Sequence, residues 1–226
     1  MQLIDKSGSG LIPFQDSIAW SKDQDQYCHL QGEEVLPLSK DAYMRAYAGE
    51  AWEKVGNTLG PKSNGLGTAC SLAKNGELFS IHFQNGILHI WSERGELNEV
   101  LELNEIFTYG HLIYDIEFQA PHFLWLAFPT GQTVAQFDLK DKIETFRIGE
   151  FTFEKKYEPL SYPETLFSTQ EELFIPCMGT GEIYKLKFET KELRLYKTTD
   201  KPLWEFVKVA MGEFVRIENS IFKLEE

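Results

Sequence analysis

The chain repeats one local pattern, in which a strand of alternating apolar and polar residues ends in a turn and a second strand follows. The clearest copy is residues 78–91, where Asn85 and Gly86 separate two alternating runs. Asn-Gly between such runs is the strongest short-range signal for a β-hairpin, because both residues readily adopt the positive φ of a type I′ turn. Long helical periodicity is scarce, so the pattern predicts an all-β fold of antiparallel sheets.

The strand–turn–strand unit recurs along the chain at intervals of about 40 to 50 residues. The central turns fall at Gly32, Gly86, Gly131, Gly181 and Asn219. A further strand follows each of the middle copies, at residues 97–103, 143–148 and 193–196. The last copy lacks such an outermost strand, and residues 1–5 are the segment that could supply it.

Repeats of this length, each with several short strands, are typical of propeller blades, because one small sheet cannot bury both of its faces alone. The pattern resembles that of the β-propeller superfamily and covers nearly the whole chain. The resemblance implies a single domain over residues 1–226, a five-bladed β-propeller whose ring is closed by the N-terminal strand. There is no Trp-Asp repeat, Kelch double glycine or Asp-box, so no particular propeller family is implied. A two-sheet β-sandwich is the alternative fold.

One segment, residues 41–67, departs from the repeat. Residues 48–55 could form a short helix, and residues 56–67 are rich in Gly, Asn and Pro. The segment is expected to be a long loop between the first two blades. Loops of this length lie on the surface and often carry function.

Four of the five segments expected to be innermost strands begin with a carboxylate, at Asp16, Asp115, Glu164 and Glu205. Innermost strands line the central channel of a propeller, so these side chains are expected to converge at one mouth. Crowded carboxylates can divide acid and base roles, because proximity raises the pKa of some of them. If the chain is an enzyme, these four residues are the predicted catalytic groups, as in the five-bladed glycosidases that this arrangement resembles.

The chain is strongly acidic, with 22 basic and 35 acidic residues and a net charge of −13. Such a charge repels nucleic-acid phosphates and attracts basic proteins. Five acids recur at every third residue, Glu93, Glu96, Glu99, Glu102 and Glu105. On an outer strand they form an acidic edge, and together with Asp115 they are the predicted partner-binding residues. Protection of the sheet edge and solubility are the alternative use of these charges.

Motifs for other chemistry are missing from the sequence. The histidines show neither HxH nor HExxH spacing, and the three cysteines lie far apart, so neither a metal site nor a cofactor is expected. No apolar stretch is long enough to span a bilayer, and the first ten residues do not resemble a signal peptide. A cytoplasmic location is therefore expected, without membrane contact.

These features predict a non-catalytic acidic module that binds a basic protein. In size, charge and its motif-poor β fold, the chain resembles the bacterial immunity proteins of contact-dependent growth inhibition. That resemblance implies an inhibitor that covers the active site of a cationic toxin such as a nuclease, with carboxylates in place of RNA phosphates. The alternatives are a propeller glycoside hydrolase or lyase that uses the channel carboxylates, and a general interaction scaffold.

Overall fold

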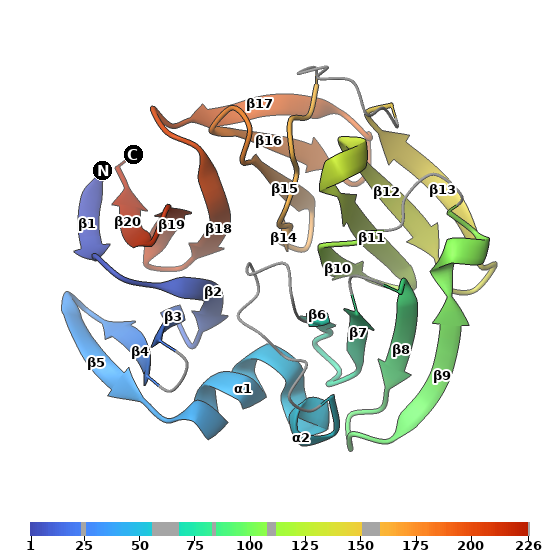
Figure 1. Cartoon of the computed structure of the whole chain (residues 1–226), viewed down its shortest axis with the longest axis horizontal. Coiled ribbons are helices and arrows are strands. Elements are labelled where there is room, and N and C mark those ends of the chain that lie inside the picture. Colours follow the sequence, from blue (N-terminus) through green and yellow to red (C-terminus); the bar gives the residue numbers. More distant parts are fainter. Residues whose placement is uncertain (24–25, 56–67, 83–84, 108–111, 151–158, 226) are drawn as a thin grey trace.

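A computed structural model of the chain describes residues 1–226 except 24–25, 56–67, 83–84, 108–111, 151–158 and 226. Five four-stranded antiparallel sheets stand around a central axis as the blades of a ring (Figure 1). The predicted five-bladed β-propeller is confirmed, and the sandwich alternative is wrong. Within the described residues, no helix is long and apolar enough to cross a membrane.

Each blade runs outward from the central channel, and its strands follow the chain order with one exception. The first blade contains β2 (Ser9–Phe14), β3 (Ser17–Asp23), β4 (Gln26–Gln31) and β5 (Glu34–Leu38). The second contains β6 (Thr68–Leu72), β7 (Leu78–His82), β8 (Ile87–Trp91) and β9 (Leu97–Glu102). The third contains β10 (Asp115–Gln119), β11 (Phe123–Phe128), β12 (Thr133–Asp138) and β13 (Ile143–Ile148). The fourth contains β14 (Phe167–Ser168), β15 (Glu172–Cys177), β16 (Glu182–Lys187) and β17 (Leu193–Thr198).

The fifth blade is the exception, because its outermost strand comes from the other end of the chain. It contains β18 (Leu203–Val209), β19 (Gly212–Ile217), β20 (Ser220–Leu224) and β1 (Gln2–Asp5). β1 pairs antiparallel with β20, with Leu3 opposite Phe222, so the two termini lie side by side (Figure 1). Closure of the ring by the N-terminal strand, as the sequence predicted, is therefore confirmed.

The repeat was assigned one strand out of register in the first blade. The innermost strand there is β2, whereas the segment that begins at Asp16 is the second strand, β3. Gly32 accordingly joins the third and fourth strands, while the other central turns join the second and third. The misassignment has a local cause: β2 contains Gly10 and Pro13, and both residue types are poor strand formers.

Residues 41–47, which were expected to belong to a loop, are helical, and so are residues 48–55, for which a short helix was predicted. α1 (Lys40–Ala48) is followed by a 3₁₀ turn, η1 (Gly49–Ala51), and by α2 (Trp52–Val55). The Ser39 side chain caps α1 by accepting the Ala42 N–H at 3.2 Å. Tyr43, Tyr47 and their apolar neighbours form one buried helical face. Residues 56–67 of the expected loop lie outside the described residues.

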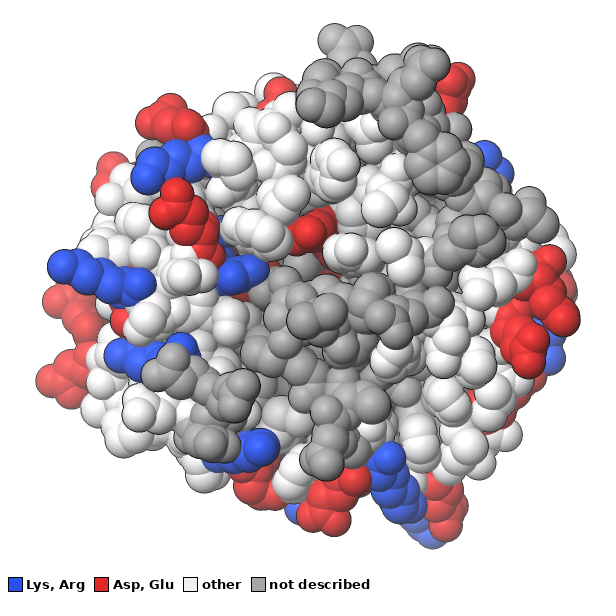
Figure 2. All heavy atoms as spheres, in the orientation of Figure 1, with Lys and Arg blue, Asp and Glu red and all other residues white. Residues whose placement is uncertain are grey.

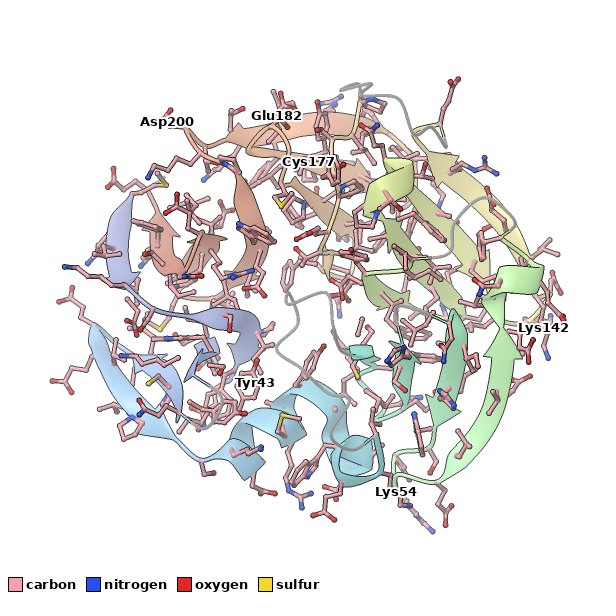
Figure 3. All side chains as sticks on the ribbon, viewed as in Figure 1. Tyr43, Lys54, Lys142, Cys177, Glu182 and Asp200 are labelled. Carbon is pink, nitrogen blue, oxygen red and sulfur yellow. The ribbon has the colours of Figure 1, made fainter. Side chains whose placement is uncertain are left out.

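Helix α1 fills the space between the first and second blades. Its buried face packs against Ile12 of β2 and Cys70 of β6. The Tyr43 hydroxyl donates to the Gly10 carbonyl at 2.5 Å, and Figure 3 shows Tyr43 where the helix meets the first blade. The insertion is therefore a structural part of the ring.

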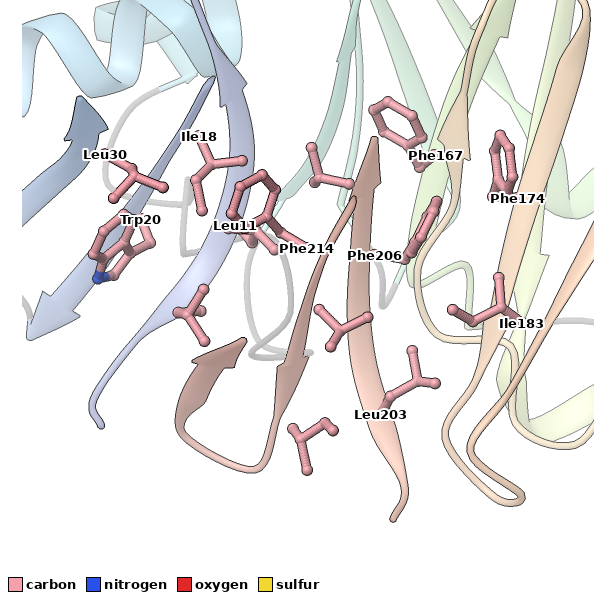
Figure 4. Close-up of a cluster of buried hydrophobic side chains, with 14 of the residues drawn as sticks. Leu11, Ile18, Trp20, Leu30, Phe167, Phe174, Ile183, Leu203, Phe206 and Phe214 are labelled. Atoms are coloured by element: carbon pink, nitrogen blue, oxygen red, sulfur yellow. The ribbon is translucent and has the colours of Figure 1, made fainter. Parts of the chain in front are cut away.

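The core lies between neighbouring blades, where their faces stack. One cluster joins the fourth, fifth and first blades, with Phe174, Phe206 and Leu11 fully or almost fully buried (Figure 4). The rings of Phe174 and Phe206 lie 5.0 Å apart, within the range of favourable aromatic contacts. Because both faces of an inner blade strand are covered, strands such as β11 are apolar at nearly every position.

Candidate active site in the central channel

The innermost strands run parallel around the channel, so that their first residues meet at one end of it. Asp115, Glu164 and Glu205 lie at this end, on or just before β10, β14 and β18. Asp16 does not join them, because it lies in the exposed turn between β2 and β3, where its carbonyl accepts the Met211 N–H at 3.3 Å. Three of the four predicted carboxylates therefore lie toward the same end of the channel, and the charge of Glu205 acts on Glu164.

Glu205 holds the ring closed between the fifth and first blades. Its two carboxylate oxygens accept the backbone N–H groups of Gly10 and Leu11, each at 3.1 Å. Its carboxylate also forms an ion pair with Arg216 of β19 at 2.9 Å, and both side chains are buried. All of these contacts give the Glu205 carboxylate a structural role.

Asp115 likewise binds a backbone N–H group across the junction between the third and fourth blades. It is completely buried, and Oδ2 accepts the Leu166 N–H at 2.7 Å. Thr165 donates to the Trp204 carbonyl at 2.7 Å across the next junction. Polar side chains of the inner strands therefore bind the backbone of the following blade. Asp115 is fully buried in this structure, and its predicted role in binding a partner stays a prediction.

Glu164 is the one carboxylate of the three that is not used in this way. In the part of the chain that the structure describes, its Oε2 is buried without a hydrogen-bond partner. Burial raises the pKa of Glu164 to about 7, with a further increase from the nearby charge of Glu205 and an opposing effect of Arg216. Near neutral pH this carboxyl group can therefore either give or take a proton.

The chain before β14 positions Glu164 through backbone contacts. The carbonyl of Tyr162 accepts the Met178 N–H at 3.0 Å, and Pro163 forms a bridge with Cys177. Tyr162 itself has a φ of 53°, an uncommon conformation for a bulky residue. Strained backbone of this kind concentrates at functional sites.

The charge of Glu164 interacts with the Tyr114 phenol and the Arg216 guanidinium. Burial raises the pKa of the Tyr114 phenol, and the charges of Glu164 and Tyr162 raise it further. The Arg216 guanidinium lies 5.2 Å from the centre of the Trp204 ring. The sequence interpretation missed Arg216, although aligning the last hairpin around Met211 and Gly212 would have placed it opposite Glu205.

The predicted acidic edge lies far from this site, on the rim of the second blade. Glu99 and Glu102 belong to β9, Glu93 and Glu96 precede it, and Glu105 lies in the 3₁₀ turn η3 (Leu103–Glu105). Glu99 forms an ion pair at 2.5 Å with Lys142 of the third blade, which Figure 3 shows at the outer rim beside β9. Charged side chains gather mainly along the rim in this view (Figure 2). Binding of a basic partner there stays a prediction.

The fold and the channel define this chain as a small five-bladed β-propeller, and comparisons with known proteins agree with that class. No protein-family model and no curated protein sequence matches the chain. Among solved structures it is similar to a streptogramin B lyase, with 12% identity, 98% of this chain and 94% of that chain covered, and a TM-score of 0.57. It is also similar to Myxococcus xanthus glutaminyl cyclase, with 10% identity, 98% and 91% coverage and a TM-score of 0.51.

A third similar structure is virginiamycin B lyase from Staphylococcus aureus, with 13% identity and a TM-score of 0.50. The match covers 94% of this chain and 64% of the lyase chain. At these identities the likeness concerns the fold. It nevertheless corrects the expectation that the chain is not an enzyme. The three structures are named as enzymes, and the streptogramin B lyase is of nearly the same length. None of the three is named as an immunity protein or a toxin inhibitor.

Proposed function

We propose that this chain is an enzyme that transfers a proton through Glu164 at the end of the central channel where the inner strands begin. The observation that carries the proposal is the buried Oε2 of Glu164, which has no hydrogen-bond partner among the described residues. A pKa of about 7 suits a group that acts as a base in one step and as an acid in the next.

The site favours elimination over the glycoside hydrolysis suggested by the four-carboxylate prediction. A typical glycoside hydrolase uses two carboxyl groups on either side of the bond that it cleaves. Here Asp115 and Glu205 bind backbone N–H groups and Asp16 lies outside the site, which leaves Glu164 for chemistry. Elimination requires only one group to remove a proton and one to protonate the leaving group.

In the proposed reaction, the ionised Glu164 takes a proton from a carbon next to a carbonyl group of the substrate. The electron pair of that C–H bond forms a C=C bond, and the bond to the leaving group on the adjacent carbon breaks. The protonated Glu164 or the Tyr114 phenol then returns a proton to the leaving group. Two of the similar structures are named as lyases, which supports this class of reaction.

The test is an assay for unsaturated products. Candidate substrates are cyclic depsipeptides with an ester linkage and polysaccharides that contain uronic acids, because both can undergo elimination next to a carbonyl group. The expected product absorbs ultraviolet light through its new conjugated double bond. A polysaccharide should give fragments whose masses add up to that of the substrate without an added water, and a cyclic depsipeptide should give one ring-opened product of unchanged mass. Glu164→Gln is expected to lower kcat by about a hundredfold or more.

Glu102→Gln is the matched control, since it makes the same change on the exposed rim and should leave the rate unaffected. Circular dichroism verifies that both variants are folded. Full activity of Glu164→Gln would overturn the assignment of this residue. Products that have gained water would show that the reaction is a hydrolysis instead.

A further inference from the structure

The opposite end of the channel holds a cavity of about 920 Å³. Each blade contributes a residue of its innermost strand to the wall, namely Ile12, Ser71, Glu117, Ser168 and Val207. These residues lie in the middle or toward the end of their strands, whereas Glu164 precedes the first residue of β14. The cavity is therefore separate from the proposed active site, and its volume is typical of small-molecule sites.

The charged side chains of the cavity wall balance one another. Among the described residues, two of each sign line the cavity, namely Lys74, Lys208, Glu77 and Glu117. Lys208 is in addition paired with Glu213 at 3.0 Å. A charged ligand would lose its hydration in this cavity without meeting a surplus of the opposite charge. The lining therefore favours a ligand that carries no net charge.

Apolar side chains supply a contact surface within the same wall. Leu72 lines the cavity and is 37% exposed, which is unusual for a leucine on an inner strand of this ring. Phe118 also lines the cavity and is only partly buried. Its ring stacks on that of Phe79, with the ring centres 4.7 Å apart, so its position is fixed. An apolar group of a ligand would cover surface that is exposed to water in the empty cavity.

A hydrogen-bonded chain of side chains fixes the amide group of Gln119 in the cavity wall. Gln119 Oε1 accepts the Trp125 indole N–H and the Gln136 Nε2–H, each at 2.8 Å. Gln136 Oε1 in turn accepts the Lys191 ammonium at 2.9 Å. The indole and the ammonium can only donate hydrogen bonds, so they determine which end of each amide is the oxygen.

The amide nitrogen of Gln119 is consequently free to donate to a ligand. Among the residues that the structure describes, none accepts a hydrogen bond from it, and Gln119 lines the cavity and is partly exposed. The charge of Lys191 polarises the chain of amides and makes the Gln119 N–H groups stronger donors. The uncharged group that fits such a donor is a carbonyl oxygen.

We propose that this cavity binds an uncharged organic amide, whose carbonyl oxygen accepts an N–H of Gln119 and whose apolar body lies against Leu72 and Phe118. The amide should bind more tightly than a cation or an anion of similar shape, because it gains the hydrogen bond without the cost of removing a charge from water. Binding involves none of the groups assigned to proton transfer, so it is independent of the proposed function.

The experiment is an NMR titration of the full chain with three probes of similar shape: phenylacetamide, phenylacetate and phenethylamine. Phenylacetamide is expected to bind about fivefold more tightly than either charged probe and to shift the side-chain amide resonances of Gln119. Gln119→Met removes the donor and should weaken phenylacetamide binding about fivefold. Gln119→Glu replaces the donor with a negative charge, so it should make phenethylamine the tightest of the three probes.

Two variants serve as controls for these changes. Gln31→Glu makes the same substitution at an exposed position at the end of β4, and should leave the order of the three probes unchanged. Glu164→Gln should leave all three affinities unchanged, which separates this site from the proposed catalytic one. Circular dichroism verifies that each variant is folded.

Absence of phenylacetamide binding, or equal affinity for the three probes, would overturn the proposal. Tighter binding of either charged probe to the unchanged protein would overturn it as well, and so would an unchanged phenylacetamide affinity in Gln119→Met. If Gln119→Met does not fold, Gln119→Glu decides alone, because its carboxylate can still accept the hydrogen bonds of Trp125 and Gln136. An unchanged order of the probes in Gln119→Glu would then exclude Gln119 as the binding group.

Discussion

The carboxylate of Glu205 in the fifth blade accepts the backbone N–H of Leu11 in the first blade at 3.1 Å, in the buried channel wall. The same carboxylate is paired with Arg216 at 2.9 Å. This contact joins residues from opposite ends of the chain, so it acts together with the β1–β20 pairing to close the ring.

Glu205→Gln is expected to lower the free energy of unfolding by about 3 to 5 kcal/mol, because it leaves the buried Arg216 without its counter-charge. Urea denaturation followed by circular dichroism measures the loss. Lys142→Ala, which removes an exposed ion pair with Glu99, is the control and should cost less than about 1 kcal/mol. Equal stability of Glu205→Gln and the unchanged protein would exclude the closing role of this carboxylate.

Removal of residues 1–5 is expected to lower the melting temperature and to promote aggregation. The deletion exposes the edge of β20 and removes Asp5, which accepts the Trp20 indole N–H at 3.1 Å and pairs with Lys22 at 2.8 Å. Calorimetry and light scattering measure the two effects. Glu225→Gln loses only the exposed ion pair with the terminal amine and should behave like the unchanged protein. A truncated chain with an unchanged melting temperature would show that β1 is not required to close the ring.

Stability should fall as pH rises through the range in which Glu164 ionises. Its pKa is about 7 in the folded chain and has an ordinary value of 4.5, so folding takes up a proton between these two pH values. The unchanged protein should lose stability relative to Glu164→Gln between about pH 5 and about pH 8. Urea midpoints at both pH values test this, with Glu102→Gln as the control. A constant difference across the range would contradict the raised pKa.

Tyr43→Phe removes the hydrogen bond from the inserted helix to the Gly10 carbonyl. The loss is expected to cost about 1 to 3 kcal/mol, because a buried carbonyl loses its partner. Tyr162→Phe, which changes a hydroxyl on a 40% exposed residue, should alter stability by less than about 0.5 kcal/mol. Chemical denaturation measures the unfolding free energy of both variants. Equal losses would show that the Tyr43 hydrogen bond does not stabilise the junction between the first two blades.

The acidic rim of the second blade predicts salt-dependent binding to basic surfaces. Glu99 is already paired with Lys142, so the exposed Glu96 and Glu102 should contribute more. Replacing both with Lys should weaken binding of a lysine-rich probe peptide about tenfold at low salt, with a smaller effect at physiological ionic strength. Fluorescence anisotropy of the labelled peptide is the measurement. Unchanged affinity would indicate that these acids serve solubility and protection of the sheet edge, and not partner binding.

Much of the architecture could be read from local signals. Gly86 and Gly181 have positive φ values of 63° and 73°. Because glycine adopts positive φ most readily, these turns could be predicted from the sequence. The missing outer strand of the last repeat likewise indicated that residues 1–5 would complete the ring. The first blade was assigned incorrectly, because Gly10 and Pro13 are poor strand formers and β2 was therefore not recognised as a strand. The helical insertion was only partly predicted, because its apolar face is buried by contacts with Ile12 and Cys70, which are distant in the sequence.

By itself, the sequence determined the blades and their closure, because alternation and turn residues act over a few neighbouring positions. It also predicted that Asp115, Glu164 and Glu205 lie at the beginnings of three inner strands. Only the tertiary structure decided their different roles. Leu166 lies 51 residues from Asp115, and Leu11 lies 194 residues from Glu205, and these distant N–H groups bind two of the carboxylates. Glu164 receives no such contact within the described residues, and its burial is what makes its proton available near neutral pH.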